Sequence, residues 1–188
     1  MPSVVLHPPR VSADYYPVRR IVFAAALCVT AFAVEIDEYQ VKAAFLYNFA
    51  KFVHWPQRAF AGPTAPVTIC VFGRNPFGFA LEQTVAGKEF EGRKFLVRSI
   101  SDTQSACQCH IVFVGGAEKK RFAALLAAVQ DSSVLTVGES PGFAAQGGVV
   151  NFTLENGAIH FEVNLEAARH KDLEISAKLL SLATVTKP

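Results

Sequence analysis

Several short apolar runs in this chain show no alternation between apolar and polar side chains. The clearest are Val67–Gly73 (VTICVFG) and His110–Val114 (HIVFV). A strand with one face in water alternates, so an unalternating run indicates a strand covered on both faces, as in a parallel sheet. Further strands are expected at Lys94–Ile100 and Val134–Val137. Because helical patterns separate the runs, the chain is predicted to form a three-layer α/β domain.

One helix is expected before these strands and two between them. The first covers Glu35–Val53, where apolar residues recur at the helical period until Trp55-Pro56 ends it. The second, Pro76–Val85, follows Asn75, which is a good N-cap, and begins with a proline suited to the first helical position. The third covers Ala117–Gln130, which is rich in alanine and leucine.

The last third of the chain has a different character. Val149–Leu154 and Ala158–Asn164 flank Asn156-Gly157, and Asn-Gly between strand-like runs is a strong hairpin signal. A helical turn at Leu165–Arg169 and an amphipathic helix at Glu174–Val185 are expected to follow. The predicted fold is therefore a mixed, mostly parallel sheet flanked by helices, with a C-terminal β-hairpin and helix.

The first 33 residues have the three parts of an export signal. The apolar run Ile21–Val34 follows Arg19-Arg20 and contains Ala31-Phe32-Ala33, a small-residue cleavage site. The alternative, a membrane anchor, needs roughly 20 apolar residues, and this run is too short. We therefore expect residues 1–33 to be a signal peptide cleaved near Ala33, and residues 34–188 to form a single exported domain.

Removal of the signal changes the charge and the cysteine count. Residues 1–33 contain three arginines and one aspartate, so the mature part has 15 basic and 15 acidic residues and a formal charge of zero. No basic run remains to suggest nucleic acid as a partner. Cys70, Cys107 and Cys109 remain, and an oxidising compartment allows them one disulfide and one spare thiol.

One segment has the position of a ligand site. Gly73–Gly78 follows a predicted strand and opens a helix, where free N–H groups and the helix dipole can hold an anion. Arg74 and Asn75 are the candidate ligand-binding residues. The segment matches neither a phosphate-binding loop nor a dinucleotide-binding motif, so an ordinary strand-to-helix turn with its cap is the favoured interpretation.

The sequence gives little sign of a metal site or a catalytic site. The mature histidines, which are scattered along the chain, are His54, His110, His160 and His170. Cys107-x-Cys109-His110 is tighter than the usual metal-binding spacing and has no second pair, so we expect no metal and no cofactor. No G-x-S-x-G motif is present, and Cys70 lies in an apolar strand where a thiol is inert. An enzyme is not supported.

The chain resembles a known family along most of its mature length. Glu38–Pro56 (EYQVKAAFLYNFAKFVHWP) is similar to the opening signature of the YfiR-like family of exported proteins. Later pieces agree in order: Cys109–Val114, Gly147–Phe152, Phe161–Asn164 and Leu173–Leu180.

This resemblance implies regulation rather than catalysis. The best-known members lie in the periplasm, bind the periplasmic sensor part of an inner-membrane diguanylate cyclase and hold the cyclase inactive. They thereby restrain cyclic-di-GMP synthesis and biofilm growth. Their release involves redox state and an outer-membrane lipoprotein, and members can be homodimers. The same role is the expectation for this chain.

The resemblance also assigns the cysteines. Cys70 and Cys109 match the family positions in the first strand and just before the third, which implies a Cys70–Cys109 disulfide. Cys107 is then the spare thiol, although it could compete for Cys70. A second pair present in better-studied members is missing between Ala117 and Pro188, so a redox response would rest on one bridge.

The hairpin and the segment after it are the expected contact surface for the partner. Its candidate residues are Phe152, Glu162, Asn164, Arg169 and Lys171. The alternative is that this segment only closes the sheet. Two other functions stay open: a periplasmic small-ligand sensor that uses Arg74, and an exported enzyme of unknown reaction.

Overall fold

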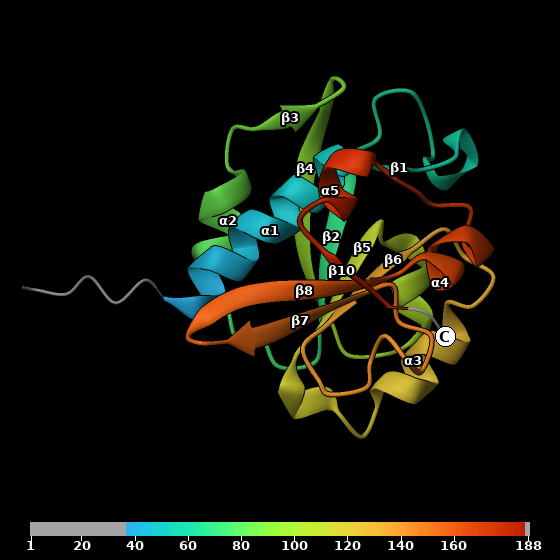
Figure 1. Ribbon diagram of the computed structural model, residues 1–188. Helices are drawn as coiled ribbons and strands as arrows, with labels where there is room; N and C mark the ends of the chain where they lie inside the picture. The colour runs from blue at the N-terminus through green and yellow to red at the C-terminus, as the bar shows by residue number, and fades with distance from the viewer. Residues whose placement is uncertain (1–36, 187–188) are drawn as a thin grey trace, which may run out of the picture. The chain divides into compact units, whose positions relative to one another are not determined.

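A mixed sheet runs through the centre of the fold (Figure 1). The computed structural model describes residues 37–186, and its eight main strands lie in the order β10-β8-β7-β6-β5-β2-β4-β3. They are β2 (Val67–Phe72), β3 (Glu89–Phe90), β4 (Arg93–Ile100), β5 (Ile111–Val114), β6 (Leu135–Gly138), β7 (Val150–Glu155), β8 (Ala158–Asn164) and β10 (Thr184–Thr186). Strands β4, β2, β5, β6 and β7 run parallel, and β10 runs parallel to β8. The pairs β7–β8 and β3–β4 are antiparallel.

Helices cover both faces of this sheet. They are α1 (Glu38–Phe52), α2 (Ala80–Val85), α3 (Phe122–Ala128), α4 (Leu165–His170) and α5 (Ala177–Leu180). On one face, α1, α2 and α5 contribute Leu46, Leu81 and Leu179 to a single apolar core. On the other face, α3 contributes Phe122 and Leu125 to a second core. The predicted three-layer α/β fold with a mostly parallel sheet is therefore confirmed.

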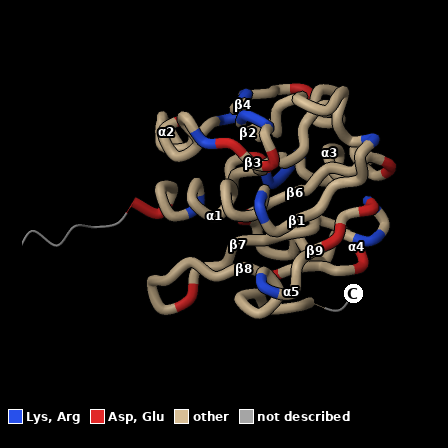
Figure 2. The backbone as a smooth tube through the Cα atoms, turned by 90° about the horizontal axis from the view of Figure 1, so that it is seen from above, with Lys and Arg blue, Asp and Glu red and all other residues tan. Residues whose placement is uncertain are grey.

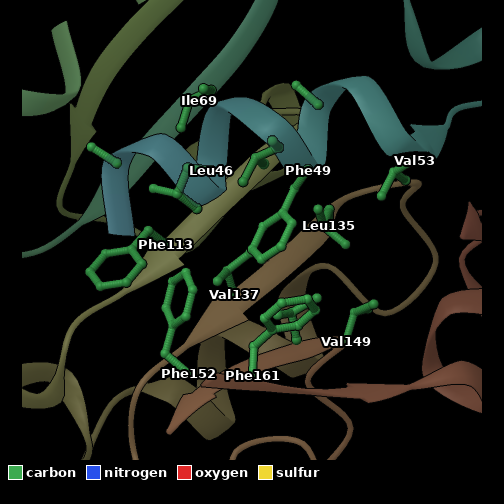
Figure 3. Packing of buried hydrophobic residues seen from close by; sticks show 14 of the residues in the cluster. Leu46, Phe49, Val53, Ile69, Phe113, Leu135, Val137, Val149, Phe152 and Phe161 are labelled. Atoms are coloured by element: carbon green, nitrogen blue, oxygen red, sulfur yellow. The ribbon is translucent and has the colours of Figure 1, made fainter. Parts of the chain in front are cut away.

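The larger core is built where α1 crosses the sheet (Figure 3). Helix α1 begins at an N-cap, Asp37, whose carboxylate accepts a hydrogen bond from the Tyr39 amide at 3.0 Å. It presents Phe49 to the β7–β8 hairpin, where the Phe49 ring centroid lies 5.8 Å from that of Phe152 and 5.2 Å from that of Phe161. Aromatic pairs at such distances contribute about 0.5–1.5 kcal/mol beyond their burial. The hairpin therefore packs beneath the first helix.

The unalternating apolar runs are the central strands, as expected. All six residues of β2 and all four of β5 are buried. In β2, Ile69 and Val71 face the core under α1, while Cys70 and Phe72 face the core under α3. Both faces are covered by apolar layers, and Thr68 is the one polar residue of these two strands.

The C-terminal helix is present, but its expected extent of Glu174–Val185 is wrong. Only Ala177–Leu180 is helical, capped by the Ser176 hydroxyl, which accepts from the Leu179 amide. On one side, β9 (Glu174–Ile175) pairs antiparallel with β1 (Val53–His54); on the other, β10 pairs with β8. Sheet pairing with distant segments outweighs the local helical pattern, and the β-branched residues of β10 suit a strand.

Two other helices are shorter than expected. In the Ala117–Gln130 segment, a 3-10 turn at Gly116–Glu118 precedes α3, which ends at Ala128. Helix α2 begins at Ala80 rather than Pro76, because Asn75 and Gly78, which has a φ of +55°, form a turn first.

The expected export signal lies outside the described residues. Within residues 37–186, no helix is long and apolar enough to cross a membrane.

Candidate functional site

The order of the strands reverses at β2. The chain passes from β2 to β4 on one side and then returns to β5 on the other side. In open α/β sheets, ligands bind at the carboxyl ends of the strands at such a switch point. A crevice of about 360 Å³ lies there, lined by Tyr39, Arg74, Asn75, Pro76, Gly115, Gly116, Ala117 and Glu139. Arg74 and Asn75, the candidate ligand-binding residues, thus lie at the switch point.

The protein's own carboxylates already occupy two amide donors at this crevice. Glu118 accepts from the Arg74 amide at 3.3 Å, and Glu139 accepts from the Gly116 amide at 2.6 Å. Gly73 has a φ of +75°, and a Cβ at this position would lie only 2.0 Å from the Glu118 Oε1. An external anion would have to displace two carboxylates to reach these donors. The geometry therefore disfavours an anion site here and agrees with the favoured interpretation of an ordinary turn.

Asn75 has a local structural role. Its Oδ1 accepts from the Phe77 amide at 2.9 Å, and its Nδ2 donates to the Gly78 carbonyl at 3.2 Å. These bonds satisfy both ends of the side-chain amide within the turn before α2. The favoured interpretation of a capped turn thus describes Asn75, while Arg74 is exposed.

A buried lysine that sequence reasoning missed supports the floor of the crevice. Lys42 is 4% exposed and forms ion pairs with Glu38 and Glu139. Burial acts to lower the pKa of Lys42, but the hydrogen bonds to the two carboxylates outweigh it and raise the pKa above its ordinary value. Tyr39 donates to Glu139 at 3.2 Å, and burial together with the Glu139 charge raises the pKa of Tyr39. The only sequence signal was a lysine in the apolar pattern of α1.

The Cys70–Cys109 disulfide implied by the resemblance is present in the structure. The Cα atoms of the two cysteines are 6.0 Å apart. The bridge joins Cys70 of β2 to Cys109, which lies just before the neighbouring strand β5. Both cysteines are buried, whereas Cys107 is a free, exposed thiol whose Sγ lies 3.3 Å from the Ala128 carbonyl oxygen. The bridge therefore lies in the core under α3, and the spare thiol lies at the surface.

Three of the five expected partner-binding residues have structural roles instead. Phe152 is 3% exposed and packs in the core. Asn164 caps α4 by accepting from the Ala167 amide at 2.9 Å and donates to the Ala144 carbonyl at 2.8 Å. Lys171 is 6% exposed and donates to the carbonyls of Val129 and Gln130 at the end of α3. Side chains buried in this way cannot reach a partner, so the contact surface expected from the sequence must be smaller.

The other two residues remain accessible in separate elements. Glu162 is half-buried on β8, opposite Thr184 of β10. Arg169 is exposed on α4 and lines a groove of about 440 Å³. The groove is lined by His54, Trp55, Pro56, Arg58, Arg169, Asp172, Leu173 and Glu174. Figure 2 shows acidic and basic positions near β9 and α4, the elements that contribute Glu174 and Arg169 to the groove.

Pairing between distant segments creates this groove. The β1–β9 pair brings His54 opposite Glu174, and an exposed ion pair joins Arg58 to Asp172. Sequence reasoning assigned Glu174 to a helix and therefore missed its place in this groove. It also missed Arg58 and Asp172. The string His54-Trp55-Pro56, which ends the opening signature, was the available signal.

His110 is buried rather than available for chemistry. Its Nδ1 accepts from the Thr68 amide at 3.0 Å, and its ring lies 4.4 Å from the Phe60 ring, nearly parallel to it. Burial lowers the pKa of His110 to about 4. Among residues 37–186, no three histidine, cysteine or acidic side chains come together in a way that could hold a metal ion.

Comparison with known proteins gives the fold and the family. A crystal structure of a conserved domain protein from Vibrio cholerae O1 biovar eltor str. N16961 superposes with a TM-score of 0.56 at 12% identity. The match covers 80% of this chain and 60% of that one, so this chain spans less than two thirds of its length; at this identity the likeness shows the fold alone. No curated protein matches the sequence. Residues 39–184 match the YfiR/HmsC-like family, and the chain therefore belongs to the YfiR/HmsC-like family.

Proposed function

We propose that this protein is a periplasmic regulator that binds the periplasmic sensor domain of an inner-membrane diguanylate cyclase and holds the cyclase inactive. Membership of the YfiR/HmsC-like family supports this role, because known members regulate in this way. The consequence for the cell is less cyclic-di-GMP and less biofilm. The proposal includes export with cleavage near Ala33, and it assigns no catalytic residue to the chain.

The groove beside α4 is the observation that carries the proposal. It joins the end of the family's opening signature, His54–Pro56, to Arg169 and Glu174 from the C-terminal segment. Its wall carries charges of both signs together with the Trp55 ring. Complementary charges around an aromatic residue favour a specific protein partner. We assign the main contact to this groove and a separate, smaller contact to Glu162.

A charge reversal at the groove tests this assignment. Arg169→Glu should weaken binding to the purified sensor domain by about tenfold or more, since it places repulsion where attraction steers the complex. Arg98→Glu is the matched control, because Arg98 is exposed on β4 and does not line the groove. Binding would be measured by biolayer interferometry, and cellular cyclic-di-GMP by mass spectrometry. Equal binding by wild type and Arg169→Glu would remove the groove from the proposal, and no binding by wild type would remove the cyclase partner.

The proposal also covers the relief of repression and the oligomeric state, both by analogy with known family members. We expect an outer-membrane lipoprotein to relieve the repression by sequestering this protein, and we expect the protein to form a homodimer. Light scattering of the mature protein checks the dimer. Competition between the lipoprotein and the sensor domain in the binding assay checks the release.

A small-ligand sensor is the second candidate function, and the switch-point crevice is the observation that favours it. Because Glu118 and Glu139 hold its amide donors, the ligand would be neutral or cationic rather than a phosphate. A thermal-shift screen with nucleotides, phosphates, amino acids and amines, repeated with Arg74→Ala, separates this function from the first. A shift by phosphate that disappears in Arg74→Ala would contradict the preference against anions.

A further inference from the structure

A further cavity, distinct from the crevice and the groove, lies between α3 and α4. Its volume is about 490 Å³, within the range of small-molecule sites. Its apolar wall is formed by Ala123, Leu126, Ala127 and Ala167. The rest of the lining is polar or charged apart from Gly147, and it comprises Gln130, Asp131, Gln146, Gly147, His170 and Lys171. The lining is about half apolar and half polar, and such a cavity fits a small amphipathic molecule.

A buried ammonium group stands in the wall of this cavity. Lys171 is 6% exposed, and its Nζ donates to the carbonyl oxygens of Val129 and Gln130, the latter at 3.4 Å. An ammonium group has three N–H donors, so one donor is left after these two bonds. Within residues 37–186, no carboxylate forms an ion pair with Lys171. Within the described residues, the Lys171 ammonium group thus has carbonyl partners but no ion-pair partner.

Burial of this ammonium group without an ion-pair partner is costly. Buried charges are normally paired, because removal from water penalises the charged form. Burial accordingly lowers the pKa of Lys171. The carbonyl groups at the end of α3 reduce this cost, since a cation is favoured at a helix C-terminus, but they do not supply a full negative charge.

Asp131 limits the charge that a ligand of this cavity can carry. It lines the same cavity, is exposed and acts to raise the pKa of Lys171, yet it forms no ion pair with that residue. A ligand with two or more negative charges would be repelled by Asp131. A single negative charge can face Lys171 while the rest of the ligand packs on the alanines.

We propose that this cavity binds a small monocarboxylate with an apolar tail. The carboxylate accepts a hydrogen bond from the Lys171 Nζ, and the tail packs against Ala123 and Ala127 on the exposed side of α3. Binding would tie α4 to α3. This site does not depend on the proposed cyclase partner.

A pair of isosteric probes tests the proposal. Hexanoate should raise the Tm of the mature protein by several degrees at millimolar concentration, and hexanamide, which has the same tail without the charge, should not. By isothermal titration, Lys171→Met should bind hexanoate about tenfold to a hundredfold more weakly, the range expected for loss of a charge-assisted hydrogen bond. Lys178→Met, at an exposed lysine of α5, should bind as wild type does.

A second pair of variants keeps the test decisive if Lys171→Met does not fold. Ala127→Leu fills the cavity from α3 and should abolish the shift, while Ala124→Leu, exposed on the same helix but outside the cavity, should retain it. The proposal is overturned by equal shifts with hexanoate and hexanamide, by no shift at all, or by a shift that survives Ala127→Leu. In those cases Lys171 serves only to cap α3.

Discussion

Gly73 shows how one backbone position maintains the switch-point crevice. Its φ of +75° belongs to the left-handed region, and the Glu118 carboxylate lies where a Cβ would be. The glycine thereby lets Glu118 reach the Arg74 amide. Gly73 therefore meets two requirements at once: a left-handed backbone conformation and room for the Glu118 side chain.

Gly73→Ala should lower the free energy of unfolding by about 1–3 kcal/mol, because the new methyl group meets Glu118 and the backbone is strained. The measurement is urea unfolding followed by circular dichroism. Gly62→Ala is the control, since a Cβ at Gly62 has no atom within 4 Å, and it should change stability by less than about 0.5 kcal/mol. Equal effects of the two changes would show that the contact with Glu118 is unimportant.

At the scale of elements, the sequence predicted the central strands and the hairpin well. Val67–Gly73 could be predicted because burial on both faces leaves a local signature that does not depend on distant residues. Glu174–Val185 could not, because its conformation is decided by pairing with β1 and β8, which are far away in the sequence. The groove beside α4 could not be predicted either, because it is created by the pairing of β1 with β9. Phe152, Asn164 and Lys171 could not be told from surface residues without knowledge of the packing around them.

The disulfide between the β2 and β5 segments gives a prediction about these elements. Replacing both Cys70 and Cys109 by alanine should lower the free energy of unfolding by about 3–4 kcal/mol, as expected for a bridge across 39 residues. Guanidinium unfolding of the double variant and the oxidised wild type measures this difference. Cys107→Ser, at the exposed thiol, is the control and should unfold as wild type does. A double variant as stable as wild type would contradict a stabilising role for the bridge.

At the scale of the whole molecule, stability should depend on pH through His110. The folded protein holds the pKa of His110 at about 4, whereas the ordinary value is 6.5. Between these values the unfolded chain binds a proton that the folded protein does not, so the free energy of unfolding falls as the pH falls. The contribution is present above pH 6.5 and is lost toward pH 4, and we expect it to be about 1–3 kcal/mol.

Urea unfolding at several pH values between 7.5 and 4 measures this dependence. His110→Gln, which retains an acceptor for the Thr68 amide, should flatten the pH profile relative to wild type. His160→Gln, at an exposed histidine of β8, should leave the profile unchanged. A wild-type slope that persists in His110→Gln would assign the dependence to other groups.

The pairing of β1 with β9 has a consequence for the order in which the chain folds. Val53 lies opposite Ile175, and the Ser176 amide donates to the Phe52 carbonyl at 2.9 Å, although these partners are more than a hundred residues apart. Contacts of such long sequence separation form late, because the entropy of closing the intervening loop must be overcome first. The end of α1 therefore stays without its partner until the last part of the chain arrives. Under the export that we propose, the chain would cross the membrane in extended form, so this pairing and the groove beside α4 would form only after export.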